Sequence, residues 1–405
     1  MRIRAFTPLR PTPDLAPQIA SVPYDVVSRE EARRLASNNP LSMLHVVRAE
    51  IDLPADTDSY SDSVYARAKE NLARMVADHV LIRETEPCIY LYQQQMDDHI
   101  QTGLVTLCHL DDYDRGLIKR HEKTRPDKEN DRTRLTSDLS ANPGPVFLTY
   151  RDLEPINQAI ESATTDAPLY DFTAEDGIRH TVWRIVGGET LINQFEDAPA
   201  FYVADGHHRA ASAARVARER MEANPHHSGV EDYNWFLTVL FPKSEIKILS
   251  YNRVVADLNA QTPEFFLDTL RKNHGLRDAG SGESTGPGDV RVALGGRWYR
   301  INLKSDPQAD PADRLDVSQL QDQVLTPVLG IGDPRTDKRI NFIGGIRGST
   351  ELTRMVDQGS AAVAFALYPV KVAQLMDIAD AGQIMPPKST WFEPKLRSGL
   401  FVHTF

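Results

Sequence analysis

The stretch FYVADGHHRAAS, residues 201–212, decides how the middle of the chain folds, and it carries the densest chemistry. Phe201–Val203 is a short apolar run that predicts a strand, and Ala210–Met221 predicts a helix. A strand that turns at Asp205 and Gly206 directly into a helix leaves the first helical N–H groups without partners, at the positive end of the helix dipole. The turn is therefore a predicted anion site that suits phosphate oxygens.

Polar side chains add to this turn. Arg209 can grip phosphate oxygens with two N–H donors, while His207 or His208 can donate to an oxyanion or move a proton. Gly206 lets the backbone approach a ligand, and Asp205 is a candidate base or metal ligand. The plain alternative is that Asp205 caps the helix and that the histidines are solvated first-turn residues. Four consecutive polar residues after an apolar strand exceed what a cap requires, so we favour phosphate binding.

A second charged segment spans Lys119–Arg134. Glu122 beside His121 is a plausible acid–base pair, but neighbouring side chains on a strand point to opposite faces, so only an irregular segment would let them act together. The segment is not a zincin motif, because Arg125 stands where the second histidine is needed. A solvated basic loop is the alternative to a phosphate-binding lid. Six basic residues crowd fourteen positions of this otherwise acidic protein: Lys119, Arg120, Lys123, Arg125, Lys128 and Arg132.

A third candidate lies near the N-terminus, in Pro23–Ser28. Asp25 precedes a helix predicted over Arg29–Ala36, for which Ser28 and Glu31 form a capping box. An aspartate there is most often a turn former. The functional alternative gives Asp25, or Glu30 in the first helical turn, the role of general base or Mg2+ ligand, and we favour Asp25.

The Asp-Gly-His-His-Arg run followed by Ala-Ala is similar to the second signature box of the ParB/sulfiredoxin-like superfamily, in which a Gly-x-x-Arg turn holds nucleotide phosphates. The whole chain resembles more closely a bacterial and archaeal family known as domain of unknown function 1015. Free-serine kinases form a branch of the superfamily with the same box. Five segments carry the resemblance: Pro23–Val27, Arg120–Thr124, Asp131–Arg132, Ala204–Arg209 and Met385–Lys395.

The resemblance implies phosphoryl transfer from ATP or ADP, or from pyrophosphate, to a small-molecule hydroxyl, with free L-serine as the first candidate and Mg2+ as the metal. It also favours a phosphate-binding lid built from His121, Lys123, Arg125 and Arg132. The alternatives are a phosphatase or nucleotide hydrolase at the same site, and a ParB-like nucleotide-binding switch without a small-molecule product.

Composition narrows the partners of the 405-residue chain. Its net charge of −11 argues against nucleic-acid binding, which needs a basic face. We expect no membrane span, since no apolar run is long enough. Cys88 and Cys108 lie in strand-like segments and are interpreted as buried small side chains, which fits a cytoplasmic location. An assembly of identical chains stays open.

Interleaved strand and helix patterns predict an α+β fold, with a mixed or antiparallel ParB-like N-terminal region and a smaller α+β C-terminal domain. We expect the division near residue 255, giving domains 1–255 and 256–405. Met43–Arg48 is expected to be a strand, and Cys88–Gln95 with Gln101–Leu110 a β-hairpin.

Overall fold

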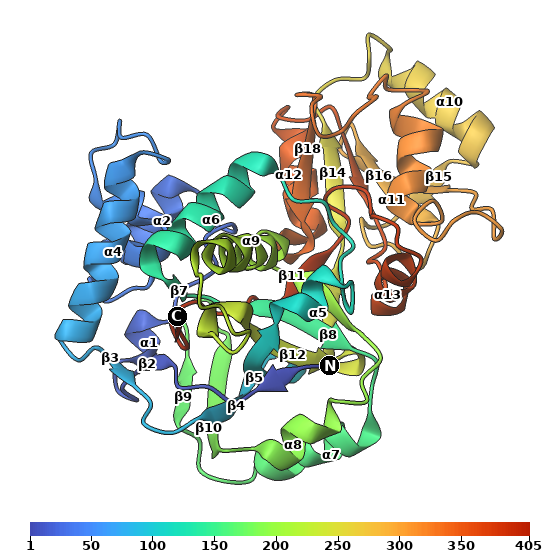
Figure 1. Cartoon of the computed structure of the whole chain (residues 1–405). Coiled ribbons are helices and arrows are strands. Elements are labelled where there is room, and N and C mark those ends of the chain that lie inside the picture. The colour runs from blue at the N-terminus through green and yellow to red at the C-terminus, as the bar shows by residue number, and fades with distance from the viewer. The chain divides into compact units, whose positions relative to one another are not determined.

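The computed structural model describes residues 1–405 and divides into two units (Figure 1). The first unit contains Met1–Ile246 together with Pro394–Phe405, and the second contains Lys247–Glu393. The mixed α+β class expected from the sequence is confirmed. The division differs from the expected one at residue 255, because the last residues of the chain return to the first unit instead of completing the second.

A nine-stranded mixed sheet organises the first unit. The expected hairpin is present, with Tyr90 opposite Val105 in its antiparallel register. The strand before the Gly206 turn pairs in parallel with β6 on one side and antiparallel with β8 on the other. In spatial order the strands are β6 (Ile118–Lys119), β11 (Phe201–Asp205), β8 (Val146–Tyr150), β12 (Trp235–Pro242), β5 (His99–His109), β4 (Cys88–Met96), β10 (Arg179–Val186) and β9 (Tyr170–Thr173), and β1 (Ile3–Arg4) also pairs with β5.

Helices cover this sheet and extend one side of the unit (Figure 1). α6 packs against both α9 and α4. The capping box of α2 is present, with Ser28 and Glu31 exchanging hydrogen bonds. The helices are α1 (Ala16–Ile19), α2 (Arg29–Ala36), α3 (Leu44–Val47), α4 (Asp62–Ala77), α5 (Leu110–Asp114), α6 (Pro126–Leu139), α7 (Glu154–Ala163), α8 (Glu189–Gln194) and α9 (His207–Ala223).

Two local expectations are corrected. The strand expected over Met43–Arg48 is wrong, because Leu44–Val47 forms the short helix α3. Its Leu44, Val46 and Val47 are all buried, and a short apolar run that is buried all round cannot be assigned to strand or helix from periodicity. The basic segment is also more ordered than a loop, since α6 begins at Pro126 directly after Arg125.

Small residues set the position of α9. Its buried face presents Ala210, Ala213, Ala214 and Ala217, which recur at helical spacing. These residues share a core cluster with Leu148 of β8 and with other side chains of the sheet. Because alanine lets a helix approach a sheet closely, the N-terminus of α9 is held rigidly at the end of β11.

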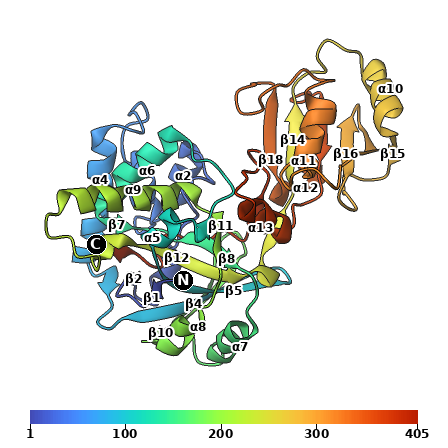
Figure 2. The same ribbon diagram turned by 45° about the vertical axis from the view of Figure 1, so that its right-hand side comes forward.

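The second unit is built on a six-stranded sheet in the order β15-β17-β16-β19-β14-β18, and Figure 2 shows α10, α11 and α12 beside it. A separate two-stranded ribbon joins β13 (Lys247–Leu249) to β20 (Trp391–Glu393). The sheet strands are β14 (Tyr251–Val255), β15 (Arg277–Ala279), β16 (Asp289–Leu294), β17 (Arg297–Asn302), β18 (Ile340–Gly344) and β19 (Val363–Ala366). The helices are α10 (Pro263–His274), α11 (Asp316–Leu320), α12 (Gly348–Asp357) and α13 (Val372–Asp380).

Other sequence expectations can be compared directly. Cys88 and Cys108 are free and buried, as interpreted. No helix in the structure has both the length and the apolar character that crossing a lipid bilayer would require.

The C-terminal segment is anchored in the first unit by backbone pairing and burial. β21 (His403–Thr404) pairs with β7 (Ala141–Asn142), and Val402 bridges to Leu9. The ring of His403 is 4% exposed, and its Nε2 lies 3.0 Å from the backbone carbonyl oxygen of Asp232. Burial lowers the pKa of His403 to about 4, so the docked segment holds a neutral histidine.

Because His403 is buried as a neutral ring, we expect part of the free energy of unfolding to be lost in acid. The stabilisation from neutral His403 is complete above the unfolded-state pKa of 6.5 and is lost as the pH falls from 6.5 through about 4. In urea titrations over this pH range, His403→Gln should remove part of the decline in the free energy of unfolding, because glutamine does not titrate. His226→Gln, at an exposed site, is the control and should leave the decline unchanged. An identical decline in both variants would contradict the assignment.

Candidate active site

The turn between β11 and α9 is built as the sequence predicts. Gly206 adopts a left-handed conformation with φ of 92°, which glycine accepts without steric cost. Asp205 Oδ1 accepts a hydrogen bond from the Gly206 N–H at 2.8 Å, but no side chain caps α9. The first N–H groups of this seventeen-residue helix therefore keep no intrahelical or side-chain acceptor, and the capping alternative for Asp205 does not describe the structure.

Asp205 holds a cation beside the turn. Its Oδ2 lies 3.1 Å from Nζ of Lys395, on the segment that returns from the end of the chain. Burial alone would raise the pKa of Asp205, but Lys395 and then Arg209 outweigh it and hold the pKa below its usual range. Asp205 is therefore ionised and poorly suited to accept a proton. Lys395 was not among the predicted site residues, although it lies in a segment that carries the family resemblance.

His121, Glu122 and His207 form a compact group beside the same turn. The residues from Arg120 to Arg125 have no regular secondary structure, which meets the condition for His121 and Glu122 to act together. The two imidazole rings meet edge to face with centroids 4.5 Å apart, and His207 Nδ1 lies 3.8 Å from Glu122 Oε2. Burial lowers the pKa of His121 to about 4, and burial together with His121 lowers the pKa of His207 well below its usual value. Both rings are therefore neutral at neutral pH.

His208 ties the basic segment to α9. Its Nε2 accepts a hydrogen bond from the Arg125 backbone N–H at 3.1 Å, so the neutral ring carries its proton on Nδ1. Burial lowers the pKa of His208, and the charge of the Asp25 carboxylate acts in the opposite direction, so Asp25 lies within electrostatic reach of this ring. The exposed guanidinium of Arg125 pairs with Asp127, while the Arg125 backbone supplies the contact with His208.

Arg209 and Arg132 line one small cavity together with Tyr24. Arg209 folds against Gly206 and donates from its Nη1 to the carbonyl of Pro145. Arg132 lies over the Tyr24 ring at 4.1 Å, while Asp131 and the Val47 carbonyl accept from its guanidinium. This cavity of about 30 Å³ has room for little more than a water molecule.

A larger cavity of about 230 Å³ is also lined by Tyr24 and Arg132. Two partly or fully buried ion pairs line it, Arg48–Glu50 at 2.8 Å and Arg132–Asp131 at 2.7 Å. The cavity thus offers both signs of charge to a small polar molecule.

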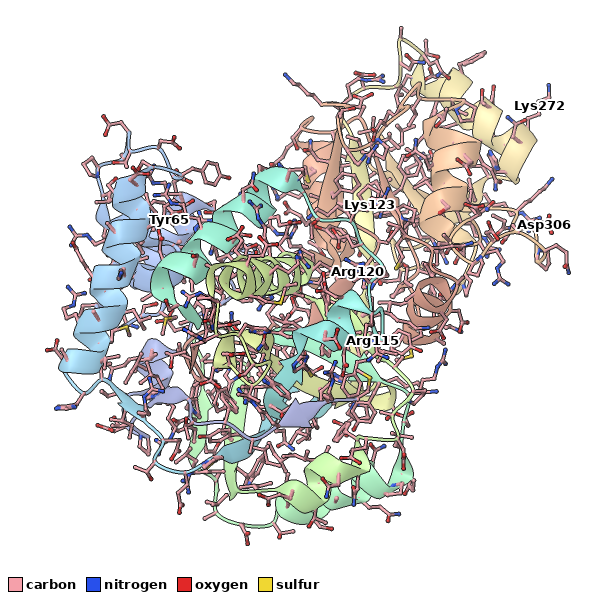
Figure 3. The ribbon with its side chains drawn as sticks, in the orientation of Figure 1. Tyr65, Arg115, Arg120, Lys123, Lys272 and Asp306 are labelled. Atoms are coloured by element: carbon pink, nitrogen blue, oxygen red, sulfur yellow. The ribbon has the colours of Figure 1, made fainter.

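The exposed side chains of Arg120 and Lys123 complete the basic segment. Figure 3 labels both on the connection that leads into α6. Arg120 lies 5.0 Å from the centroid of the Tyr113 ring, and its charge is one of the causes that lower the pKa of the buried His207. The structure thus places Arg120 within electrostatic reach of the turn.

The three candidate segments of the sequence therefore converge within the first unit. Asp25, the His121-Glu122 pair and the Asp205–Arg209 turn meet at the N-terminus of α9, with Lys395 added from the C-terminal segment. Arg132 lies deeper, on Tyr24.

A family model supplies an independent comparison. The model described as "Protein of unknown function (DUF1015)" matches residues 3–318. The chain belongs to the DUF1015 family. No curated protein matches it in sequence, and its likeness to the ParB/sulfiredoxin-like superfamily stays a prediction.

Several solved structures are similar to this DUF1015 protein over 73% of its length, with TM-scores below 0.4. They include a free serine kinase in complex with AMP, which is 13% identical, is covered over 92% of its own chain and gives a TM-score of 0.35. SbnI with a C-terminal truncation from Staphylococcus aureus is 11% identical, with 87% of that chain covered and a TM-score of 0.37. A conserved hypothetical protein from Pyrococcus furiosus is 11% identical, with 94% covered and a TM-score of 0.34.

The geometry of the turn predicts a specific effect of Gly206→Ala. An added Cβ would meet the Arg209 guanidinium at 3.0 Å, in addition to the strain of a left-handed alanine. Gly177→Ala is a matched control, because Gly177 has φ of 80° with no atom within 4 Å of the added Cβ. Urea unfolding should show a loss of roughly 1–2 kcal/mol for the control and a larger loss for Gly206→Ala. Equal losses would show that Arg209 does not constrain the turn.

Proposed function

We propose that this protein is a phosphotransferase that moves a phosphoryl group from ATP, ADP or pyrophosphate to the hydroxyl of a small molecule. The observation that carries the proposal is the uncapped N-terminus of α9, where open backbone N–H groups adjoin the Lys395 cation and the Asp25 carboxylate lies within electrostatic reach of His208. Phosphoryl transfer asks a protein mainly to position the reactants and to neutralise their charge, which these groups can do.

The donor phosphates would bind at the turn. The N–H groups of His207 and His208 point along the helix dipole, and Lys395 is fixed beside them by the ionised Asp205. The exposed Lys123 and Arg120 add positive charge at the mouth of the site. Arg209 would mainly stabilise the conformation of the turn, because its guanidinium packs against Gly206.

The acceptor hydroxyl would be activated from the opposite side. Asp25 is exposed, lies within electrostatic reach of His208, and can accept the hydroxyl proton as the hydroxyl oxygen attacks the terminal phosphorus. The bond from that phosphorus to the bridging oxygen breaks, and the leaving phosphate keeps the electron pair. The same carboxylate is also suited to the Mg2+ that accompanies nucleotide phosphates, because Mg2+ prefers oxygen ligands and needs few from the protein.

The 230 Å³ cavity beside Tyr24 is our proposed place for the acceptor. Its paired arginines and carboxylates match the two charges of a free amino acid, and Tyr24 precedes Asp25 directly. The sequence resemblance makes L-serine the first acceptor to test.

The test is to incubate the pure protein with L-serine, Mg2+ and each of ATP, ADP and pyrophosphate, and to follow products by mass spectrometry. Phosphoserine is expected with one donor. Asp25→Asn should lower turnover by about 100-fold or more, the scale of general base catalysis. The exposed Asp14→Asn is the control and should retain turnover.

Other outcomes would overturn parts of the proposal. Loss of turnover in Glu30→Gln with full turnover in Asp25→Asn would move the base to Glu30. Free phosphate without phosphoserine would show a hydrolase at the same site, and bound nucleotide without turnover would show a binding switch.

A further inference from the structure

The His121, Glu122 and His207 group contains polar atoms that nothing in the fold satisfies. His121 is 1% exposed and His207 is 6% exposed. Neither ring nitrogen of His121 has a hydrogen-bond partner, and neither does Nε2 of His207. A buried polar atom without a partner costs about 1–3 kcal/mol, so unpartnered nitrogens on two touching buried rings call for a ligand.

The donor atoms of this group are those of a metal site. One atom from each of the three side chains lies within 4.8 Å of the other two. We propose that His121, Glu122 and His207 bind one divalent transition-metal ion of the Zn2+ class. Two imidazoles and one carboxylate suit Zn2+ and similar ions, whereas Mg2+ prefers oxygen ligands. This site is distinct in chemistry from the Mg2+ that would accompany a nucleotide.

The geometry needs only a small adjustment to close around an ion. Ligand atoms about 2.1 Å from a tetrahedral ion lie about 3.4 Å apart. His207 Nδ1 and Glu122 Oε2 are already 3.8 Å apart, and the two rings are in contact. Glu122 is on an irregular segment with its side chain 42% exposed, so no helix or strand fixes its backbone.

The surroundings fit a metal-binding histidine. Ligating imidazoles usually direct their second nitrogen at a backbone carbonyl or a carboxylate. The Val203 carbonyl interacts with His121 but does not form a hydrogen bond of normal geometry, so it is the candidate outer partner of this ring.

Three protein ligands leave at least one coordination position of the ion open. Catalytic metal sites keep such an open position, whereas structural metal sites do not. His207 is also the first residue of α9, so an ion here would adjoin the predicted anion site. If the proposed function holds, the open position would take a phosphate oxygen of the donor. The metal site itself does not depend on that function.

The test is metal uptake by chelator-treated full-length protein, with Zn2+ as the probe in calorimetry and Co2+ as a spectroscopic probe. The parent protein should bind one ion per chain and give the visible absorption of Co2+ with histidine ligands, with no nucleotide or serine present. His207→Gln and Glu122→Gln should each weaken Zn2+ binding by more than about 100-fold, the upper end of the effect that loss of an outer partner causes. Because these variants are read by binding alone, failure of the kinase assay would leave the result intact.

Controls separate this site from surface binding. The exposed His226→Gln should bind as the parent does, and Glu122→Gln, altered at a partly exposed side chain, should keep the parent's circular dichroism even if His207→Gln does not fold. Equal Zn2+ affinity in the parent and in a folded Glu122→Gln or His207→Gln would overturn the proposal, as would a parent that binds no ion.

Discussion

The ion pair between Asp205 and Lys395 connects the two segments of the first unit, Met1–Ile246 and Pro394–Phe405, beside the turn that begins α9. Asp205 ends the strand β11 and fixes the Gly206 N–H, while Lys395 arrives on the segment that docks through β21. Because Asp205 is kept ionised by this partner, its charge positions Lys395 instead of taking part in proton transfer. The turn, the uncapped helix and the added cation all depend on this arrangement.

The histidines around the turn divide into two kinds. His208 accepts a hydrogen bond from the Arg125 N–H and so connects the basic segment to α9. His207 and His121 lack such partners and are buried against each other. This contrast is the physical basis for assigning phosphate chemistry to the outer side of the turn and metal binding to the inner side.

Local patterns in the sequence were sufficient for much of this fold. The β11–Gly206–α9 turn, the capping box at Ser28 and the β4–β5 hairpin each follow from residues close in the chain. The helix α3 and the return of Pro394–Phe405 to the first unit do not follow from residues close in the chain, because burial by distant segments decides both. Lys395 and Asp205 are 190 positions apart, and no spacing rule connects them. The contact of His121 with His207 could not be predicted for the same reason, since no spacing rule connects these two residues.

Binding of a polyanion at the N-terminus of α9 is the central claim, and backbone amide NMR of protein labelled with ¹⁵N-histidine measures it most directly. Addition of pyrophosphate should shift the amide signals of His207 and His208, whose N–H groups are open at the turn. The signals of His226 and His227, beyond the far end of α9, should not move. Unchanged His207 and His208 signals at saturating pyrophosphate would contradict the account.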